Sequence, residues 1–485
     1  MSTPLTPLSI LFAYMTLGFC VAFPSLACSY VMIDTLKFTA ADVATTALLC
    51  AVPWCVKPLF ATLSDRCVCC FGGYRRRPWV HVFSLCTVVT MASTPAYAAV
   101  DTSGWFVLML VCTSTSLCVV DVAIDGSLLT LIAEESDADE GKLQTHSWTA
   151  RIAGGCLASG WSGYAYETLG FDSILTGCAM LPLILSIVAF DLPDVAVDPR
   201  RAPSLQCRTV LRDVLAGLFA CRYTLAGAVL VSLVPEINTS LFFYLLSAKA
   251  SPKQMALVDV SGAISSLVTL GLYNVLRPNH KCSFFTGVVL NAVAAACGAA
   301  LADDAVPWLL EGAAAEAVLA AVGSALILMP LVTVLGKTAA QTRNEATTYS
   351  CALSVLNMAS VLSETIAANA MRQLRIEKGD VNNVRVFVGV VSVLTLMTAP
   401  AACLLPSRLG DAPKPHAYQI AHTQPAVATD LSAFSIGGDD SSEDSSKDFS
   451  DDGSKHADDP DPKHSEVVPV TSAAAAHPSR QMPPV

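Results

Sequence analysis

Charged residues are scarce in this sequence, and their scarcity limits what kind of protein it can encode. Only 14% of the 485 residues are charged, whereas 53% are hydrophobic, and this composition excludes an ordinary soluble domain. Most of the formal charge of −11 comes from the end of the chain, where from Arg408 onward thirteen acids stand against six bases. The remaining body is nearly neutral, so the sequence indicates no general affinity for nucleic acid.

Motifs that would indicate catalysis or a cofactor are also missing. The sequence has no nucleotide-binding loop, HExxH helix or nucleophile elbow, so we expect neither an ATP-driven pump, nor an enzyme, nor a cofactor. The eighteen cysteines are scattered, many of them through apolar segments, and they predict no disulfide framework. Cys67 and Cys70 have C-x-x-C spacing without further ligands nearby, so no metal site is predicted. No basic segment precedes the first apolar stretch, so no cleaved signal peptide is expected.

Long apolar segments are what the sequence has instead. A helix needs about 20 apolar residues to cross the ~30 Å hydrocarbon core of a bilayer. Such windows predict twelve transmembrane helices, near 8–33, 43–63, 79–99, 104–125, 146–168, 171–191, 223–246, 254–276, 282–302, 310–335, 346–371 and 384–405. The chain is therefore predicted to be an all-α membrane protein with both termini on the same side.

The connections predict how these helices are divided and oriented. The longest interior connection, 192–222, is rich in proline and charge and follows the sixth helix. We therefore expect a six-helix half at 1–191, this linker, a second half at 223–405 and a disordered acidic cytoplasmic tail at 406–485. Two six-helix halves are the plan of the major facilitator superfamily, whose substrate site lies near the bilayer midplane. With the termini inside, fourteen bases fall in inside loops and seven in outside loops, which predicts cytoplasmic termini.

A basic hairpin joins the second and third predicted helices, in the sequence PWCVKPLFATLSDRCVCCFGGYRRRP at 53–78. A Lys/Arg excess in a short loop is typical of the cytoplasmic side. Its charges also match the cytoplasmic gate of the superfamily in kind, because an acid there can bind an arginine or helix amides of the other half. The predicted gating residues are Asp65, Arg66, Arg75, Arg76 and Arg77. The alternative is that the arginines only set topology and bind lipid headgroups.

Ionisable residues inside predicted helices are the strongest functional signal in the sequence. Each costs roughly 2.5–3.5 kcal/mol to insert, so such residues usually face a cavity or a partner. The set is Lys57, Asp121, Asp125, Arg151, Glu236, Asp259 and Glu364. Asp121 and Asp125 are four residues apart and share one helix face, and Arg151 enters the next helix at a similar depth. We expect an Asp–Arg ion pair, which either serves a cavity or only holds two helices together.

Five sequence stretches, read together, resemble the folate–biopterin transporter family of the major facilitator superfamily. They follow the order of that family over nearly the whole body, and they are PWCVKPLF with SD and GYRRRP (53–78), DVAIDG (121–126), GKLQTHSWTARIAGG (141–155), SLFFYLLSAKASPKQ (240–254) and NEATTYSCALSVLN (344–357). The resemblance implies a secondary transporter that imports a folate or a biopterin-type pteridine by proton symport. We expect it in the plasma membrane or, alternatively, in an internal membrane. The alternatives are another heterocyclic cargo such as S-adenosylmethionine, or a membrane sensor that does not transport.

For a pteridine cargo, the resemblance also implies roles for individual residues. A pterin presents two parallel N–H donors, which Asp125, or alternatively Asp121, could accept; the glutamate tail of a folate would bind Arg151 or Lys57. Stacking on the ring would come from Phe242, Phe243 and Tyr244, unless these residues face lipid or only pack. Proton coupling needs a carboxylate that gains and loses a proton during alternating access, and Glu364, followed by Glu236, is the expected one, unless either is simply hydrogen-bonded to a neighbouring helix.

Overall fold

The computed structural model is almost entirely helical over the residues that it describes, which are 8–66, 74–133, 141–194, 207–302, 309–342, 345–376 and 383–408. Its α-helices are α1 (Leu8–Tyr30), α2 (Ala40–Cys55), α3 (Lys57–Arg66), α4 (Arg77–Ser93), α5 (Ser103–Ala133), α6 (Lys142–Cys178), α7 (Leu181–Val188), α8 (Cys207–Ala220), α9 (Arg222–Ser232), α10 (Asn238–Ser247), α11 (Pro252–Leu276), α12 (His280–Leu301), α13 (Leu309–Ala340), α14 (Glu345–Gln373) and α15 (Val384–Met397). Short π or 3-10 turns extend some of them: η1 (Val31–Thr35), η2 (Thr94–Tyr97), η3 (Val100–Thr102), η4 (Ala189–Asp191) and η6 (Ala399–Leu404).

These helices account for the predicted number of membrane crossings when one over-long segment is divided in two and one bent pair is counted as a crossing. Among the described residues, ten helical segments are long and apolar enough to cross a membrane, and a bent pair adds an eleventh. One of the ten runs from Lys142 to Asp191, and its 50 residues would extend about 75 Å as a single helix, far more than a bilayer needs. Gly170 breaks it with a φ of 74°, and the chain then returns along α1 and α4. Divided there, the segments make the twelve crossings that the sequence predicts.

The seventh crossing is discontinuous. α9 ends at Ser232 and α10 begins at Asn238, so the intervening residues, which include Pro235, are not helical. Proline has no backbone N–H and cannot continue a helical hydrogen-bond ladder. α8 precedes α9 and meets it at 76°, so part of the predicted linker is a helix that lies across the bundle axis. Residues 195–206 of that linker and the predicted tail beyond residue 408 lie outside the described residues.

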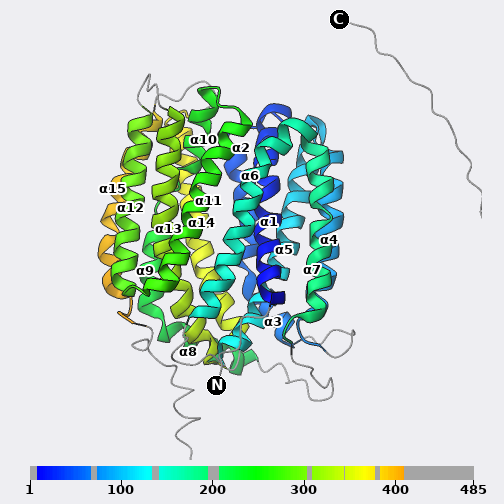
Figure 1. Cartoon of the computed structure of the whole chain (residues 1–485), viewed down its shortest axis with the longest axis vertical. Helices are drawn as coiled ribbons and strands as arrows, with labels where there is room; N and C mark the ends of the chain where they lie inside the picture. Colours follow the sequence, from blue (N-terminus) through cyan, green and yellow to red (C-terminus); the bar gives the residue numbers. More distant parts are fainter. Residues whose placement is uncertain are drawn as a thin grey trace, which may run out of the picture. The chain divides into compact units, whose positions relative to one another are not determined.

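Figure 1 shows the helices side by side, with α1 beginning and η6 ending at the lower end and α10 near the upper end. The first six crossings run from α1 to α7 and the last six from α9 to η6. Several contacts join these halves. The two most extensive are those of α2 and α3 with α14 and of α6 with α11, and α5 also packs against α13 and α14. A space between the two contact zones is thereby bordered by helices of both halves.

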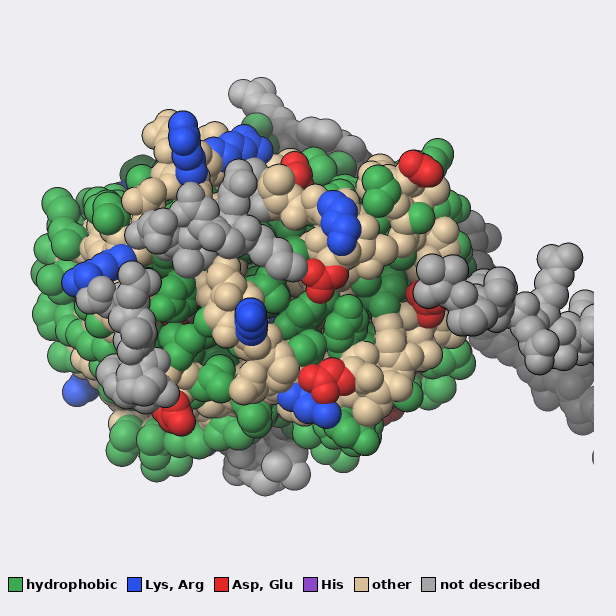
Figure 2. Space-filling view, turned by 90° about the horizontal axis from the view of Figure 1, so that it is seen from above, with side chains coloured by type: hydrophobic (Ala, Val, Ile, Leu, Met, Phe, Trp, Pro, Cys, Tyr) green, Lys and Arg blue, Asp and Glu red, His purple; other side chains and the backbone are tan. Residues whose placement is uncertain are grey.

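The outer surface of the bundle is apolar. Viewed onto the upper end in Figure 2, hydrophobic side chains predominate around the edge, while Lys, Arg, Asp and Glu are scattered over the face. Large apolar side chains such as Trp161, Val275 and Met397 are more than two-thirds exposed. In water such exposure would be unfavourable, so the surface is suited to contact with lipid tails.

Candidate functional site

A central cavity of about 600 Å³ lies between the two halves. Its volume falls within the range of pockets that hold small organic ligands. Polar and charged side chains of both halves line it, namely Trp54, Lys57, Asp121, Asp125, Trp148 and Arg151 from the first half and Ser232, Glu236, Asn238, Asn291, Glu316, Ser324, Asn357, Ser360 and Thr395 from the second. The cavity therefore brings together four charged residues singled out in the first half and Glu236 of the second.

Four of these charges form one buried cluster. Asp121 accepts from Lys57 through one carboxylate oxygen and from Arg151 through the other. Lys57 also lies 3.8 Å from Asp125. The predicted pairing of an aspartate with Arg151 is thus present, and Lys57 joins it from the kinked helix pair α2–α3. Two cations balance two carboxylates, which offsets much of the desolvation cost of burying them.

The two aspartates differ in how much accepting capacity they retain. Asp121 is 1% exposed and uses both oxygens on cations. Asp125 accepts from the Tyr14 hydroxyl at 2.5 Å through Oδ1, while its other oxygen is the one 3.8 Å from Lys57. Since a carboxylate offers about four acceptor positions, Asp125 is the better placed of the two to accept from a ligand.

Tryptophan rings complete the cationic side of the cluster. The Lys57 ammonium lies 4.7 Å from the ring centre of Trp54, and the Arg151 guanidinium lies 5.4 Å from that of Trp148. Such cation–π contacts contribute roughly 0.5–2 kcal/mol each. The Arg151 side chain remains 18% exposed and uses one nitrogen on Asp121, so its other N–H groups can face the cavity.

The backbone under Arg151 is fixed by a close crossing of α1 and α6. A Cβ atom on Gly18 would lie 2.0 Å from the carbonyl oxygen of Arg151, and one on Gly154 would lie 1.9 Å from that of Met15. Only glycine allows backbones to approach this closely. The two glycines therefore set the position from which the Arg151 guanidinium reaches Asp121.

Next to the cluster, a proline leaves one backbone carbonyl of the first half to accept hydrogen bonds from the second half. Pro58 lacks the N–H that would bond the Trp54 carbonyl within a helix, and the chain leaves helical geometry at Val56. α14 supplies donors instead: Asn357 Nδ2 lies 2.8 Å from that carbonyl oxygen and Ser354 Oγ lies 3.2 Å from it. An orphaned backbone acceptor is thus satisfied across the interface between halves.

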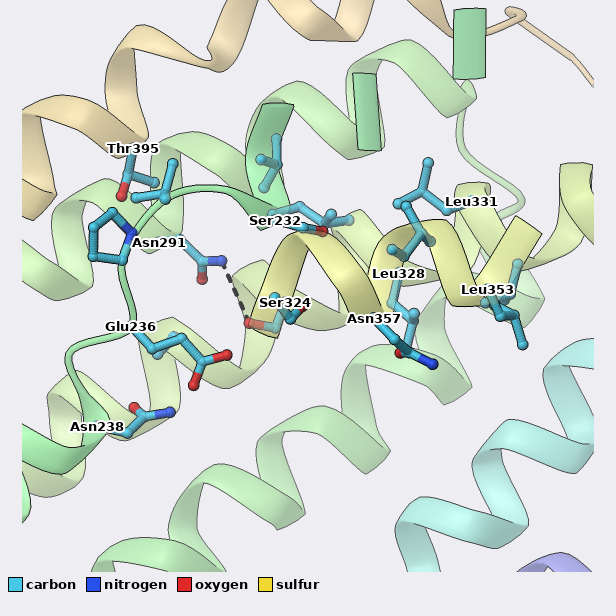
Figure 3. Close-up of a pocket in the computed structure, with 18 of the residues that line it drawn as sticks. Ser232, Glu236, Asn238, Asn291, Ser324, Leu328, Leu331, Leu353, Asn357 and Thr395 are labelled. Carbon is cyan, nitrogen blue, oxygen red and sulfur yellow. Dashed lines mark hydrogen bonds between the residues drawn. The ribbon is translucent and has the colours of Figure 1, made fainter. Parts of the chain in front are cut away.

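The second half contributes acids and amides to the cavity. Figure 3 shows Glu236 and Asn238 projecting from the break between α9 and α10, with Asn291 hydrogen-bonded to Ser324 at 3.4 Å nearby. Glu316 of α13 also lines the cavity and is 8% exposed. Among the described residues that line the cavity, the second half contributes no lysine or arginine. The charge on this side is therefore negative.

Glu364 lies near the cavity rather than on its wall. Ser360 lines the cavity, and Glu364 follows it by one turn of α14. Its Oε2 atom is buried and has no hydrogen-bond partner within the described part of the chain. Asp125 and Arg151 thus line one space, and Glu364 is not among the residues that line it.

The three aromatic residues of α10 do not line the central cavity. Phe242, Phe243 and Tyr244 line a second space of about 490 Å³, here called the upper cavity, which lies among α10, α11 and α13. The Tyr244 hydroxyl donates to the carbonyl of Leu301 at 2.8 Å. Asn238 and Glu316 line both cavities. These rings are therefore not placed to stack on a ligand in the central cavity.

At the lower end, the predicted gating residues have different surroundings. Arg76 is 2% exposed; it donates to the Gly126 carbonyl and to Thr130, and its guanidinium lies 3.1 Å from Glu345, the first residue of α14 in the second half. Arg75 lies 3.9 Å from the same carboxylate.

Arg77, in contrast, donates to the carbonyl of Leu192, at the start of the linker, and contacts Tyr74 of the first half. The side chains of Asp65 and Arg66 lie outside the described residues. Gln144 and Tyr349 add a second bond between the halves at 2.9 Å.

Three participants were not anticipated from the sequence. Tyr14 and Glu345 are ordinary residues in sequence, and only the tertiary packing brings them to Asp125 and Arg76. Glu316 was detectable, because it is an acid inside the predicted window 310–335.

A bundle of twelve crossings in two halves, with a polar cavity between them, is the architecture of major facilitator transporters. Solved structures agree: a D-xylose–proton symporter matches with a TM-score of 0.61 at 14% identity over 82% of this chain and 97% of that one. The nucleoside transporter NupG matches with a TM-score of 0.57 at 14% identity over 81% and 99%. The fold is therefore that of an integral, multi-pass membrane protein.

Residues 17–297 match the model of the BT1 family, and the chain belongs to that family. A folate-biopterin transporter of Synechocystis sp. is 25% identical over 420 residues, which are 82% of this chain and 81% of that protein. A protein named probable folate-biopterin transporter 4 of Arabidopsis thaliana is 28% identical over 173 residues, 35% of this chain and 34% of that one. The resemblance drawn from the sequence motifs is confirmed.

Proposed function

We propose that this protein imports folate or biopterin-type pteridines by proton symport, through alternating access of the central cavity. The observation that carries the proposal is the pairing, within one cavity, of a carboxylate with spare accepting capacity and a guanidinium with spare donors. Asp125 would accept the parallel N–H groups of a pterin ring, and Arg151 would bind the carboxylate of a folate tail. Lys57 and Asp121 would hold these two residues in place.

Proton coupling would depend on Glu236 and Glu364. Glu236 lines the negative side of the cavity, and Glu364 lies one turn beyond the lining residue Ser360, with a buried oxygen that has no hydrogen-bond partner among the described residues. A buried carboxylate without a cationic partner can lose its charge by taking up a proton. A proton taken up there from one side of the membrane and released on the other would couple transport to the proton gradient.

Alternating access would use the lower end as its cytoplasmic gate. The bonds from Arg76 to Glu345 and from Gln144 to Tyr349 cross between the halves at the end where the chain enters and leaves the bundle. With the termini in the cytoplasm of a plasma-membrane protein, these bonds would close the cytoplasmic side. Their rupture would accompany opening of the cavity toward the cell interior.

Uptake in cells that lack folate import tests this proposal directly. Labelled folate and labelled biopterin should enter only with the protein present, and an imposed pH gradient should accelerate entry. Asp125→Asn should reduce pterin uptake to background while leaving the amount of folded protein unchanged. A normal rate in this variant would remove Asp125 from the binding site.

A cationic heterocycle such as S-adenosylmethionine is the second candidate cargo. The excess of acids on the second-half side of the cavity favours a positively charged ligand. Labelled S-adenosylmethionine included in the same assay distinguishes the two, since entry of this cation alone would replace the pteridine proposal. Binding of a cargo without entry of any would instead indicate a sensor.

A further inference from the structure

The upper cavity has a chemical character of its own. Its walls carry two acids, Asp259 of α11 and Glu316 of α13, and the rings of Phe242, Phe243 and Tyr244. No lysine, arginine or histidine is among the described residues that line it. Carboxylates beside aromatic faces form the combination that recognises a positively charged organic group, because both attract cations.

One of the two acids, Glu316, is buried rather than part of a solvated surface. The residue is more than nine-tenths buried, at 8% exposure, and no hydrogen bond or ion pair joins it to any described residue. Burying an unpaired carboxylate is costly, so such a residue normally has a charged partner or faces a site that receives one. Because it lines both cavities, a cation held by Glu316 would lie on the border between them.

The two acids are held at a fixed separation by close helix packing. Gly262 lies one turn after Asp259, and a Cβ there would lie 3.2 Å from the carbonyl oxygen of Ala317, the residue that follows Glu316. Ser266 Oγ also lies 3.4 Å from the carbonyl of Ala321. α11 and α13 therefore approach closely beside the upper cavity, which places both carboxylates on its wall.

The aromatic rings form a layer against this wall. The rings of Phe242 and Phe243 meet edge-on at 6.3 Å, and Tyr30 contacts Phe242 at 6.1 Å. Within the described residues no group of three or more His, Cys, Asp or Glu is arranged to hold a metal ion. The chemistry of the cavity thus fits a cation with an organic face better than it fits a bare metal ion.

We propose that the upper cavity is a second binding site, which takes an organic monocation bearing an aromatic or alkyl face. The carboxylate of Glu316 supplies the counter-charge, Asp259 adds to the negative potential, and the ring of Phe242 stacks on the cation or its apolar face. The site stands apart from the pteridine proposal, since it needs neither transport nor Asp125. A ligand there would lie next to the central cavity, separated from it by Asn238 and Glu316.

Direct binding to the full-length protein in lipid nanodiscs tests the proposal. The probe is tritiated benzyltrimethylammonium, a monocation with one aromatic ring, and empty nanodiscs give the background. Saturable binding is expected in the wild-type protein, at least tenfold weaker in Glu316→Gln. Glu311→Gln is the matched control, because Glu311 is an exposed acid on the same helix that lines neither cavity.

Three further variants localise the probe. Phe242→Leu should weaken binding about three- to tenfold, whereas Phe285→Leu, which alters an exposed ring of α12, should not. Asp259→Asn should weaken binding and replaces Glu316→Gln if the latter does not yield folded protein. Asp125→Asn should leave binding of the probe unchanged.

The proposal is overturned by either of two results. One is equal affinity in the wild type, Glu316→Gln and Asp259→Asn. The other is loss of binding in Asp125→Asn, which would place the probe in the central cavity. Because no uptake is measured, saturable binding in a protein that imports no pteridine would refute only the proposed function. Pteridine uptake without probe binding would refute only this site.

Discussion

The two walls of the central cavity differ in whether their charged side chains have partners of opposite charge. In the first half, Lys57 and Arg151 are bonded to Asp121, and Asp125 lies beside Lys57, so that cations and carboxylates balance. In the second half, Glu236 and Glu316 line the cavity without a basic residue beside them among the lining residues that are described. One wall is a closed ionic network and the other presents unpaired acids.

This contrast separates two tasks that intramembrane charges can perform. A paired network holds donors and acceptors in a fixed geometry. An unpaired buried acid can accept a proton or bind a cation, because either event removes an uncompensated charge. Variants of the first wall should therefore disturb structure and binding, and those of the second should disturb coupling and selectivity.

The largest effect is expected from Asp121→Asn. The substitution leaves Lys57 and Arg151 as buried cations without their shared partner, and breaking a buried pair costs about 3–5 kcal/mol. We expect a lowered thermal midpoint in detergent and uptake at background. Asp172→Asn, at an exposed position of the same half, is the control. An unchanged midpoint for Asp121→Asn would mean that the network is not structural.

Glu364→Gln should have the next largest effect. It should impair only the coupling of uptake to the proton gradient. A glutamine cannot be protonated and deprotonated, so uptake driven by a pH gradient should fall at least tenfold. Exchange of labelled for unlabelled cargo, which needs no net proton movement, should persist. The measurement is gradient-driven uptake beside counterflow in the same proteoliposomes. Equal loss of both activities would indicate that Glu364 supports structure or cargo binding instead.

A smaller effect is expected from Glu345→Gln at the lower end. It weakens the contact with Arg76 by an amount on the order of 1 kcal/mol, since the glutamate is partly exposed. Opening of the lower end should become more frequent, and deuterium exchange should increase in residues 141–150 and 345–352. Glu167→Gln, which removes a pair with Lys253 at the other end, should leave these segments unchanged. An equal increase in both variants would argue against a specific gate.

The smallest effect is expected from removing a hydrogen bond between the halves beside Pro58. Asn357→Leu removes a donor to the Trp54 carbonyl and should destabilise the protein by about 1 kcal/mol. In a Pro58→Ala background the restored backbone N–H can bond that carbonyl, so the same substitution should cost less. A double-mutant cycle on thermal stability measures the difference. Strictly additive costs would show that the carbonyl does not depend on the proline.

The fold could be predicted from the sequence largely because a bilayer imposes one dominant requirement. Each crossing needs an apolar segment of nearly fixed length, and this signal does not depend on what the segment packs against. The breaks were harder to predict. Gly170 and Pro235 are common residues, and nothing local shows that one reverses the chain and that the other interrupts a crossing at the cavity wall.

The candidate site could be predicted only in part. Spacing placed Asp121 and Asp125 on one face, and the cost of burying Arg151 predicted a carboxylate partner. The network also needs Lys57 and Tyr14, whose positions depend on how α3 and α1 pack against α5. The aromatic run at 242–244 was expected beside the cargo, but it lines the upper cavity and not the central one.

The close crossing of α1 and α6 means that substitutions away from the cavity can change which cargo is bound. Gly18 and Gly154 have no side chains to offer a ligand, yet each supports the stretch of main chain that carries Arg151. A single methyl group at either position would push two helices apart and displace the guanidinium with them. A mutational screen for altered cargo should therefore recover these two sites beside the residues that touch the ligand.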